Sequence, residues 1–318
     1  MNIPLVNKSE LTKIIRGKIL AGGFHQVGIA AAEKLDKSEL LVNWLKAGKH
    51  GSMSWMKNHV EARLDIKRFL PEARSVVMAA QNYYTDHTQS EDPSKGKISR
   101  YAWGRDYHKI IRKKLKIILL EMKQLYPGIE GKVFVDTAPV QEKLWAAQAG
   151  IGWLGKNTNI ISRAYGSWIF LGGLALTIEL EYDQPATDFC GKCHACIDAC
   201  PTGALRPYSI DASRCISYLT IENKDDEIPV EFQDKLQNWI FGCDICQEVC
   251  PWNRKAVPTD EIRYHPDPAH IAPDLEEMTR LSEEDFKKQF AGSPVLRAKH
   301  KYFIRNVKTV LKSGQKSG

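Results

Sequence analysis

The sequence predicts an α+β protein, with a layered α/β domain over residues 1–185, a cysteine-rich domain over 186–256 and a short helical extension over 257–318. Helical and strand patterns alternate up to residue 185, all eight cysteines fall within residues 190–250, and the tail ends in a basic stretch. With 318 residues and 43% hydrophobic residues, the chain is long enough for one large or two smaller packed domains.

The first domain is predicted to alternate helices with strands. Ser38 and Asp106 are expected as N-caps, because their side-chain oxygens can accept hydrogen bonds from the free N–H groups of a first turn. Pro127 and Gly150 are expected to mark the ends of two helices. The helices are predicted over residues 8–20, 38–47, 106–126 and 140–149, and the strands over 26–32, 75–81, 132–135 and 168–181.

The two later domains carry weaker patterns. In the cysteine-rich part a helix is expected near residues 231–240, and the tail is expected to form a basic helix over 297–312. The most apolar run of the chain, residues 168–180, is interrupted by two glycines, a threonine and a glutamate. This run therefore predicts a buried strand rather than a membrane span.

The N-terminal segment and the net charge indicate where the protein is located and which partners it can bind. Residues 1–10 lack the basic-then-apolar layout of a secretory signal and carry no twin-arginine pair, so a cytoplasmic location without membrane contact is expected. The formal charge of +7 permits a polyanionic partner such as nucleic acid. Surface lysines that serve solubility would give the same balance.

Seven of the eight cysteines form two runs that each end in Cys-Pro. The first run reads C-x2-C-x2-C-x3-C-P, and the second reads C-x2-C-x3-C-P. The first spacing is that of bacterial ferredoxins, in which three thiolates bind one [4Fe–4S] cube and the fourth reaches a second cube. The runs consist of Cys190, Cys193, Cys196 and Cys200, and of Cys243, Cys246 and Cys250, with Cys215 between them.

The same crossover logic assigns ligands to two clusters. The first three cysteines of the first run share one cluster with Cys250, and Cys200 joins Cys243, Cys246 and the remaining Cys215 in the other. Three other interpretations are weaker. The spacing is not the usual zinc arrangement, disulfides are unexpected in a chain without an export signal, and no cysteine is left over for catalysis. His194 is expected to be a spacer or a neighbour rather than a ligand.

Two adjacent clusters transfer single electrons and need an acceptor, so the residues before them are expected to bind a further group. A ferredoxin alone would need far fewer residues. The sequence contains neither a G-x-G-x-x-G fingerprint nor a P-loop. Asp106-Tyr107-His108 begins like the D-x-H-x-x-G motif of proteins that supply a histidine to the cobalt of cobalamin, but Ile111 occupies the glycine position and the motif fails.

Several segments together resemble the epoxyqueuosine reductase family, which are cobalamin-dependent iron–sulfur enzymes, over roughly residues 10–310. The cysteine run alone is shared by many ferredoxin-like proteins, whereas the combination is highly specific. The matching segments are RYAWGRDYH at 100–108, VDT at 135–137, AGIG at 149–152, KN at 156–157, YGS at 165–167, and the segments 190–205, 214–217 and 242–244.

The resemblance implies a substrate, a reaction and a cofactor. The substrate would be tRNA with epoxyqueuosine at the anticodon wobble position, and the epoxide would be reduced by two electrons to the cyclopentene of queuosine, with loss of oxygen as water. Cobalamin would be bound base-off without a histidine ligand from the protein, in agreement with the failed motif. A low-potential electron donor and a monomer are also implied. Many members continue into a helical-repeat domain that this sequence lacks, so weaker tRNA docking is expected.

Asp136 follows a predicted strand and precedes a predicted helix, at the position of the family's proton donor. Opening an epoxide places negative charge on oxygen, which a positioned acid would neutralise. A raised pKa of Asp136, through burial beside an apolar corrin ring, is therefore expected. Without the resemblance, Asp136 would be interpreted as a helix N-cap. Position matching further implies that the contacts to cobalamin are Arg63, Ser99, Asp136, Ile160, Leu171, Ser217 and Asp244.

Asp244 directly follows Cys243, so the cluster that contains Cys243 is expected to face the corrin and electrons are expected to enter through the other cluster. Basic side chains are expected on tRNA phosphates and aromatic rings on unstacked bases. A solvated helix face at 112–116 and a core position for Trp103 stay open as alternatives. The candidates are Arg100, Arg105, Lys109, Arg112, Lys113, Lys114 and residues 297–308 for phosphates, and Tyr101, Trp103 and Tyr107 for bases.

Two other functions stay open. A reductive dehalogenase would share the corrin and the two clusters but act on small halogenated molecules, and such proteins usually carry a twin-arginine leader that is not seen here. An electron-transfer ferredoxin with a partner-docking domain would not be an enzyme. Absence of cobalamin binding by the purified protein would favour that last function.

Overall fold

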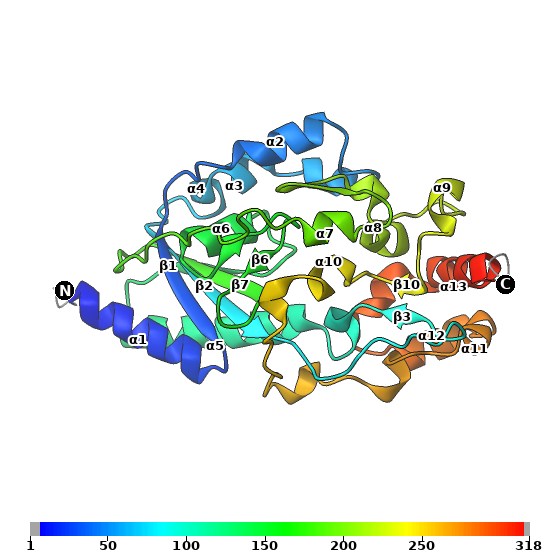
Figure 1. Ribbon diagram of the computed structural model, residues 1–318. Helices are drawn as coiled ribbons and strands as arrows, with labels where there is room; N and C mark the ends of the chain where they lie inside the picture. The colour runs from blue at the N-terminus through cyan, green and yellow to red at the C-terminus, as the bar shows by residue number, and fades with distance from the viewer. Residues whose placement is uncertain (1–6, 315–318) are drawn as a thin grey trace.

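The computed structural model describes residues 7–314, and their largest sheet has four strands covered by helices on both faces (Figure 1). Each strand runs antiparallel to its neighbours, so the predicted α+β class is confirmed for this part of the chain. The cytoplasmic location was expected from residues 1–10, and the first six of these lie outside the described residues. The strands, in spatial order, are β1 (Gln26–Ala31), β2 (Ser75–Asn82), β7 (Ile169–Leu176) and β4 (Gly131–Phe134).

Alternate residues of the central strand β2 enter two different hydrophobic cores. Val77 and Ala79 pack with α1 (Lys8–Ala21) and α5 (Tyr107–Leu125), whereas Met78 packs with α6 (Glu142–Gln148). Successive strand side chains point to opposite faces, so a strand between two helical layers is apolar throughout. Every residue of β2 is buried, as this arrangement requires. Figure 1 shows α1 and α5 on one side of the sheet and α6 on the other.

The predicted helices of the first domain are present, with one error in capping and one in extent. Asp106 caps α5 by accepting a 3.0 Å hydrogen bond from the His108 N–H. Ser38 precedes α2 (Glu39–Lys46) in a helical conformation, and its hydroxyl makes no capping bond. The predicted helix 140–149 begins only at Glu142, the first residue of α6. The segment between β1 and β2 also holds α3 (Val60–Leu64) and α4 (Ile66–Phe69).

The cysteine-rich part consists of short elements, and the predicted helix 231–240 is wrong in its second half. Gln237 and Asn238 have φ angles of 46° and 66°, which end helical geometry. The apolar residues that follow form β10 (Trp239–Phe241), which pairs in parallel with β3 (Lys97–Ile98). The remaining elements of this part are α7 (Ala195–Asp198), β8 (Leu205–Arg206), β9 (Ser209–Ile210), α8 (Ile216–Ile221), α9 (Val230–Gln233) and α10 (Ile245–Glu248). The hairpin of β5 (Trp153–Leu154) and β6 (Ile160–Ile161) precedes them in the chain.

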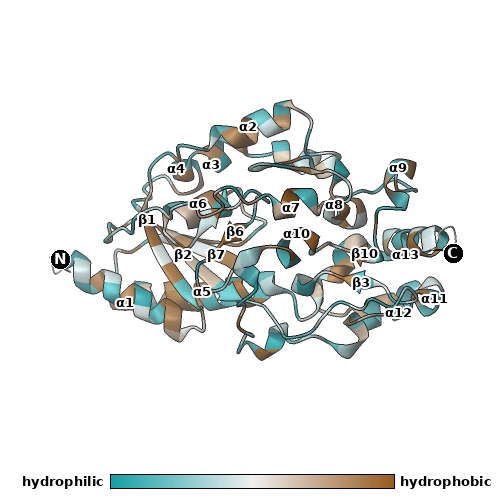
Figure 2. Ribbon diagram, viewed as in Figure 1, coloured by the Kyte–Doolittle hydropathy of each residue, from teal (hydrophilic) through white to brown (hydrophobic). Residues whose placement is uncertain are grey.

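The C-terminal extension packs against the cysteine-rich part. Its last helix, α13 (His300–Gly314), begins later than predicted because Lys299 has a φ of 63°. Phe303, Val307 and Val310 of α13 share one core with β10 and α8, and Figure 2 shows apolar and polar residues alternating along this helix. The other elements are α11 (Leu275–Thr279), α12 (Glu283–Gln289) and the 3-10 helices η1 (Ser54–Lys57), η2 (Arg100–Ala102), η3 (Ala212–Arg214), η4 (Pro251–Asn253), η5 (Ile262–Tyr264), η6 (Pro268–His270) and η7 (Pro294–Ala298).

Between residues 7 and 314, none of the helices combines the length and the apolar character needed to cross a membrane.

Two glycines give opposite predictions for stability. A β carbon at Gly28 of β1 would lie 1.9 Å from the carbonyl oxygen of Ala149, which is backbone and cannot move aside. We expect Gly28→Ala to destabilise the fold by roughly 3 kcal/mol. Gly17 lies on the exposed face of α1 with nothing near its missing side chain, so Gly17→Ala should stabilise by about 1 kcal/mol. Thermal unfolding of both variants checks the pair, and a Gly28→Ala protein as stable as the wild type would contradict this packing.

Candidate functional site

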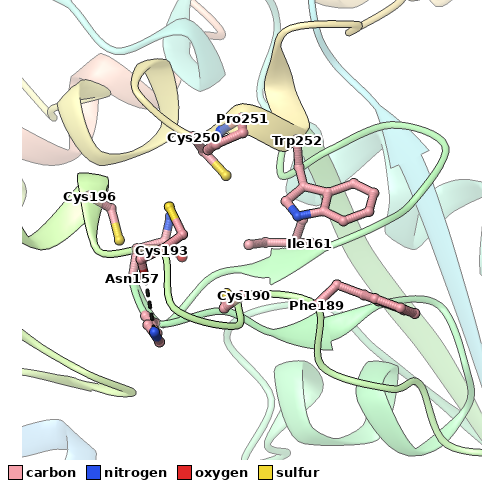
Figure 3. Close-up of a pocket in the computed structure, with 10 residues that line it drawn as sticks. Asn157, Ile161, Phe189, Cys190, Cys193, Cys196, Cys250, Pro251 and Trp252 are labelled. Atoms are coloured by element: carbon pink, nitrogen blue, oxygen red, sulfur yellow. Dashed lines mark hydrogen bonds between the residues drawn. The ribbon is translucent and has the colours of Figure 1, made fainter.

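The first cysteine group consists of Cys190, Cys193, Cys196 and Cys250, which surround one small pocket beside Trp252 (Figure 3). Figure 3 shows the thiols of Cys193, Cys196 and Cys250 pointing into a shared space. Burial raises the pKa of the Cys196 thiol, and the neighbouring Cys250, Cys190 and Cys193 raise it further. The four cysteines that the sequence assigned to one cluster therefore lie together, although Cys250 lies 54 positions after Cys196 in the chain.

The second cysteine group consists of Cys200, Cys215, Cys243 and Cys246. Burial raises the pKa of the Cys243 thiol, as do the nearby Cys215 and Cys246. Burial raises the pKa of Cys215 as well, and Cys200 adds to the shift. Cys200 joins this group because α7, which precedes it, packs against α10, which contains Cys246. All eight thiols are free of disulfides.

The hairpin of β5 and β6 holds the loops of both cysteine runs. The Lys156 ammonium donates hydrogen bonds to the carbonyl oxygens of Gly191 (2.6 Å) and Cys193 (2.9 Å). The Asn157 amide donates to the carbonyl oxygen of Cys246 at 3.3 Å. The positive charge of Lys156 and the amide hydrogens of Asn157 lower the negative potential beside the thiols. This favours a dense group of anionic ligands.

A cavity of about 990 Å³ lies beside the second cysteine group. Cys215 lines it, and so do four of the residues expected on cobalamin, namely Asp136, Ile160, Leu171 and Ser217. Besides His108, its charged lining comprises four lysine or arginine cations and three carboxylate anions. These are Lys109, Arg112, Lys143 and Arg297, and Asp106, Asp136 and Glu222.

The other three residues expected on cobalamin do not line this cavity. Asp244 is fully buried, and its carboxylate accepts hydrogen bonds from the Ser99 hydroxyl (2.5 Å) and the Arg100 N–H (2.8 Å). Ser99 and Asp244 thus join the 97–102 segment to the second cysteine run. Arg63 is half-buried at the end of α3, and its carbonyl oxygen accepts a 3.0 Å bond from Gln141.

One wall of the cavity carries a chain of three hydrogen-bonded groups. His108 lies in the first turn of α5, where its Nδ1 meets the Asp106 carboxylate at 2.6 Å. Its Nε2 meets the Asp136 carboxylate at 2.9 Å. Both ring nitrogens of His108 are therefore engaged by carboxylates.

The two carboxylates favour a protonated His108. Burial lowers the pKa of His108, but the hydrogen bonds to Asp106 and Asp136 outweigh burial and raise it to about 9. Burial would raise the pKa of Asp136, but the hydrogen bond from His108 lowers it below its ordinary value. In the protein alone, the pKa of Asp136 is therefore lowered, and the rise expected beside a corrin ring stays a prediction. The proton is held by the His108–Asp136 pair and not by the carboxyl alone.

Asp136 occupies the loop between β4 and α6 with a φ of 47°, a left-handed conformation that is uncommon for a residue other than glycine. Its N–H donates a 2.5 Å hydrogen bond to the Glu142 carboxylate, and Arg112 donates a 2.8 Å bond to the Thr137 hydroxyl. The side chain of Asp136 caps no helix, because α6 begins after Gln141. The alternative interpretation of Asp136 as an N-cap is wrong.

Sequence reasoning missed His108, Glu142 and Lys143 as site residues. His108 ends the family segment 100–108 and belongs to a failed metal-binding motif, but a carboxylate two residues before a histidine at a helix start is itself a signal. Lys143 lines the cavity and donates to the carbonyl oxygen of Thr158 at 2.9 Å. No pattern in the sequence links Glu142 to the backbone of Asp136.

Two RNA-contact candidates are core residues instead. Trp103 is 1% exposed, and Arg100 is 8% exposed with its guanidinium donating to the backbone oxygens of Thr85 and His87. Lys114 pairs with Glu261 at 2.8 Å. Of the remaining candidates, Lys109, Arg112 and Arg297 line the cavity, as do Tyr101 and Tyr107.

Comparison with known proteins agrees with these features. Residues 189–253 match the model "4Fe-4S double cluster binding domain", which contains all eight cysteines. Fold and site thus define the class: an iron–sulfur protein with a two-cluster domain beside a large cavity. Residues 63–137 match the model "Epoxyqueuosine reductase QueG, DUF1730".

Full-length relatives give the particular family. An epoxyqueuosine reductase of Synechocystis sp. is 45% identical over 290 residues, covering 90% of this chain and 100% of the relative. A solved epoxyqueuosine reductase with a tRNA-Tyr epoxyqueuosine-modified stem loop has a TM-score of 0.90 and 32% identity, covering 97% of this chain and 83% of that one. The Bacillus subtilis enzyme, solved with its catalytic aspartate loop swung out of the active site, has a TM-score of 0.89, 30% identity and the same coverage. The chain belongs to the epoxyqueuosine reductase family.

The hydrogen-bonded chain at His108 predicts a pH dependence of stability. The pKa of His108 is raised from an ordinary value of about 6.5 to about 9. Its stabilisation is therefore fully present below about pH 6.5 and is lost as pH rises through about 9. We expect the melting temperature to fall over this window in the wild type and to fall less in His108→Gln. Parallel pH profiles for the two proteins would contradict a charged His108.

Proposed function

We propose that this protein reduces epoxyqueuosine at the wobble position of tRNA to queuosine. One observation carries the proposal: a single cavity joins the second cysteine group, at Cys215, to the proton-holding pair of His108 and Asp136. Electron supply and proton supply thus meet at one place, as a reduction with loss of oxygen requires. The solved relative with an epoxyqueuosine-modified stem loop supports the choice of substrate. A tRNA substrate also supports a cytoplasmic site of action.

We propose that each cysteine group holds one [4Fe–4S] cluster. Four cysteines converge in each group, and a cluster needs four thiolate ligands. When bound, the clusters would supply electrons one at a time at low potential. The group that contains Cys215 borders the cavity, whereas the first group lines a separate pocket that includes the exposed Cys193. This arrangement supports entry of electrons from a low-potential donor through the first group and exit through the second.

The cavity also fits cobalamin, which the family resemblance implies. Its volume of about 990 Å³ is at the upper end for ligand sites, and its walls combine apolar side chains such as Ile160 and Leu171 with polar groups such as Ser217. His108 has both nitrogens bound to carboxylates and is not free to coordinate a metal, which supports a cobalamin without a histidine ligand from the protein. When bound, a reduced corrinoid would supply the electron pair that opens the epoxide.

The residues of this chain handle the protons. Reduction of the epoxide to the alkene consumes two electrons and two protons and releases the epoxide oxygen as water. Asp136 delivers the proton at the cavity surface, and the His108 imidazolium supplies that proton through the 2.9 Å hydrogen bond. Asp106 stabilises that imidazolium from the other side and fixes the orientation of the ring. Glu142 and Arg112 hold the loop that carries Asp136.

A reductive dehalogenase is the second candidate function. A solved catabolic reductive dehalogenase, NpRdhA, shares the fold at a TM-score of 0.50 and 14% identity, while this chain covers only 39% of it. This likeness concerns the fold alone. A non-enzymatic ferredoxin does not account for the large cavity that contains Asp136.

Anaerobic turnover tests the function. Reconstituted protein, cobalamin, a strong reductant and tRNA with epoxyqueuosine should yield queuosine, seen as the loss of one oxygen in digested nucleosides by mass spectrometry. Asp136→Asn keeps the size of the side chain but removes the carboxylate that delivers the proton, so we expect a loss of at least ~100-fold in rate. Full turnover without cobalamin, or by Asp136→Asn, would contradict the proposal. Conversion of a chlorinated substrate with no action on tRNA would favour the dehalogenase.

Iron content tests the ligand groups. Cys196→Ser and Cys246→Ser should each lower bound iron from about eight atoms per chain to about four, since each variant loses one cluster. The matched control is His194→Ala, because His194 lies between Cys193 and Cys196 but bonds to the Asp198 carboxylate. This control should keep its iron and its visible absorption. Full iron content in a cysteine variant would overturn the assignment of that residue.

A further inference from the structure

Trp55 is an exposed tryptophan in the lining of the substrate cavity. It belongs to η1, its side chain lies beside the open space, and the residue is 42% exposed. Tryptophan is costly to leave in water because of its large apolar area. It is the only tryptophan among the large apolar residues that are exposed between residues 7 and 314. Its position at the cavity therefore points to a ligand that covers the ring.

Arg297 of η7 lies over the ring of Trp55. Its guanidinium carbon is 5.9 Å from the ring centroid, and its Nε donates to the Glu222 carboxylate. Within the described part of the chain, this is the only hydrogen bond of the guanidinium, so both terminal nitrogens are open to a further acceptor. The pKa of Arg297 is raised by Glu222 and, more weakly, by Asp136. The pair thus lies within electrostatic reach of the proposed acid.

The segment that carries Trp55 is fixed to the cysteine-rich part. The Ser52 N–H donates a 2.7 Å hydrogen bond to the Tyr218 hydroxyl, which in turn donates to the Ser52 hydroxyl at 2.7 Å. Gly51 has a φ of 57°, and a β carbon there would lie 2.5 Å from the Tyr218 ring, so this approach requires glycine. Tyr218 belongs to α8, which follows Cys215 directly. Trp55 is therefore held in a set position relative to the second cysteine group.

A nucleotide that reacts inside a cavity must leave its base stack, and its neighbours then lose a stacking partner. Proteins that bind single-stranded RNA replace that partner with an aromatic ring or the plane of an arginine. We propose that Trp55 and Arg297 form a stacking platform for an unpaired base of the anticodon loop next to the modified nucleotide. This inference rests on the proposed function. It commits to RNA and names no base, because stacking is tolerant of sequence.

Binding of RNA to the reconstituted holoprotein tests the platform. The probe is a fluorescent anticodon stem loop with epoxyqueuosine, measured by anisotropy at fixed salt. Stacking is worth about 1–3 kcal/mol per base, so Trp55→Ala should weaken binding by about 5- to 150-fold. Trp55→Phe keeps a ring and should lose less. The matched control is Tyr182→Ala, which also removes an exposed aromatic ring. Tyr182 lies beside Lys8, is distant from Trp55 in the sequence and does not line the cavity.

A set of stem loops with single abasic sites identifies the stacked base. One abasic RNA should lose as much affinity for the wild type as Trp55→Ala loses for intact RNA, and the double change should cost no more. Equal affinity of wild type and Trp55→Ala, or additive losses at every abasic site, would overturn the platform. Weaker binding of cobalamin alone by Trp55→Ala, with RNA affinity intact, would also overturn it. The wild-type scan needs no variant, so misfolding of Trp55→Ala leaves the test decisive.

The turnover assay separates the two proposals. Formation of queuosine by the wild type, together with unchanged RNA binding by Trp55→Ala, removes only the platform. Lack of turnover by the wild type on intact modified RNA removes the proposed function, whatever the binding data show.

Discussion

The packing of α7 against α10 is the constraint on which the site depends. Each helix is followed by a cysteine that belongs to the other run's group: Cys200 after α7 and Cys250 after α10. Neither group of four is complete unless the two runs are held side by side. Lys156 and Asn157, on the hairpin of β5 and β6, add hydrogen bonds to both loops. The two cysteine groups and the cavity are thus positioned by the same contacts.

The C-terminal extension completes this arrangement. Its helix α13 buries Phe303 and Val307 in one core with β10 and α8, and Arg305 donates to the backbone oxygens of Leu219 and Asn223. Because α8 begins beside Cys215 and carries Tyr218, the same core fixes the segment that presents Trp55. Loosening α13 would therefore disturb a cysteine group and the cavity together.

The proton-holding side of the cavity is built from a different part of the chain. The start of α5 supplies Asp106 and His108, and the loop between β4 and α6 supplies Asp136. Two carboxylates stabilise one imidazolium, so the site keeps a proton available above neutral pH without a neutral carboxyl group. The cost is one residue, Asp136, held in a left-handed conformation, in a loop that Glu142 and Arg112 restrain through hydrogen bonds.

The sequence by itself determined the α+β class, most helices and strands, and the division of eight cysteines into two sets, because period, capping and ligand spacing are local properties. It also singled out Asp136, although through family resemblance. The proton-holding role of His108, the burial of Trp103 and Arg100, and the strand at Trp239–Phe241 depended on tertiary structure. A pKa and a stacking surface depend on contacts between residues that are distant in the chain. A local sequence pattern does not indicate which distant residues come into contact. The sequence therefore predicted the kind of chemistry, whereas tertiary packing determined which residues line the same cavity.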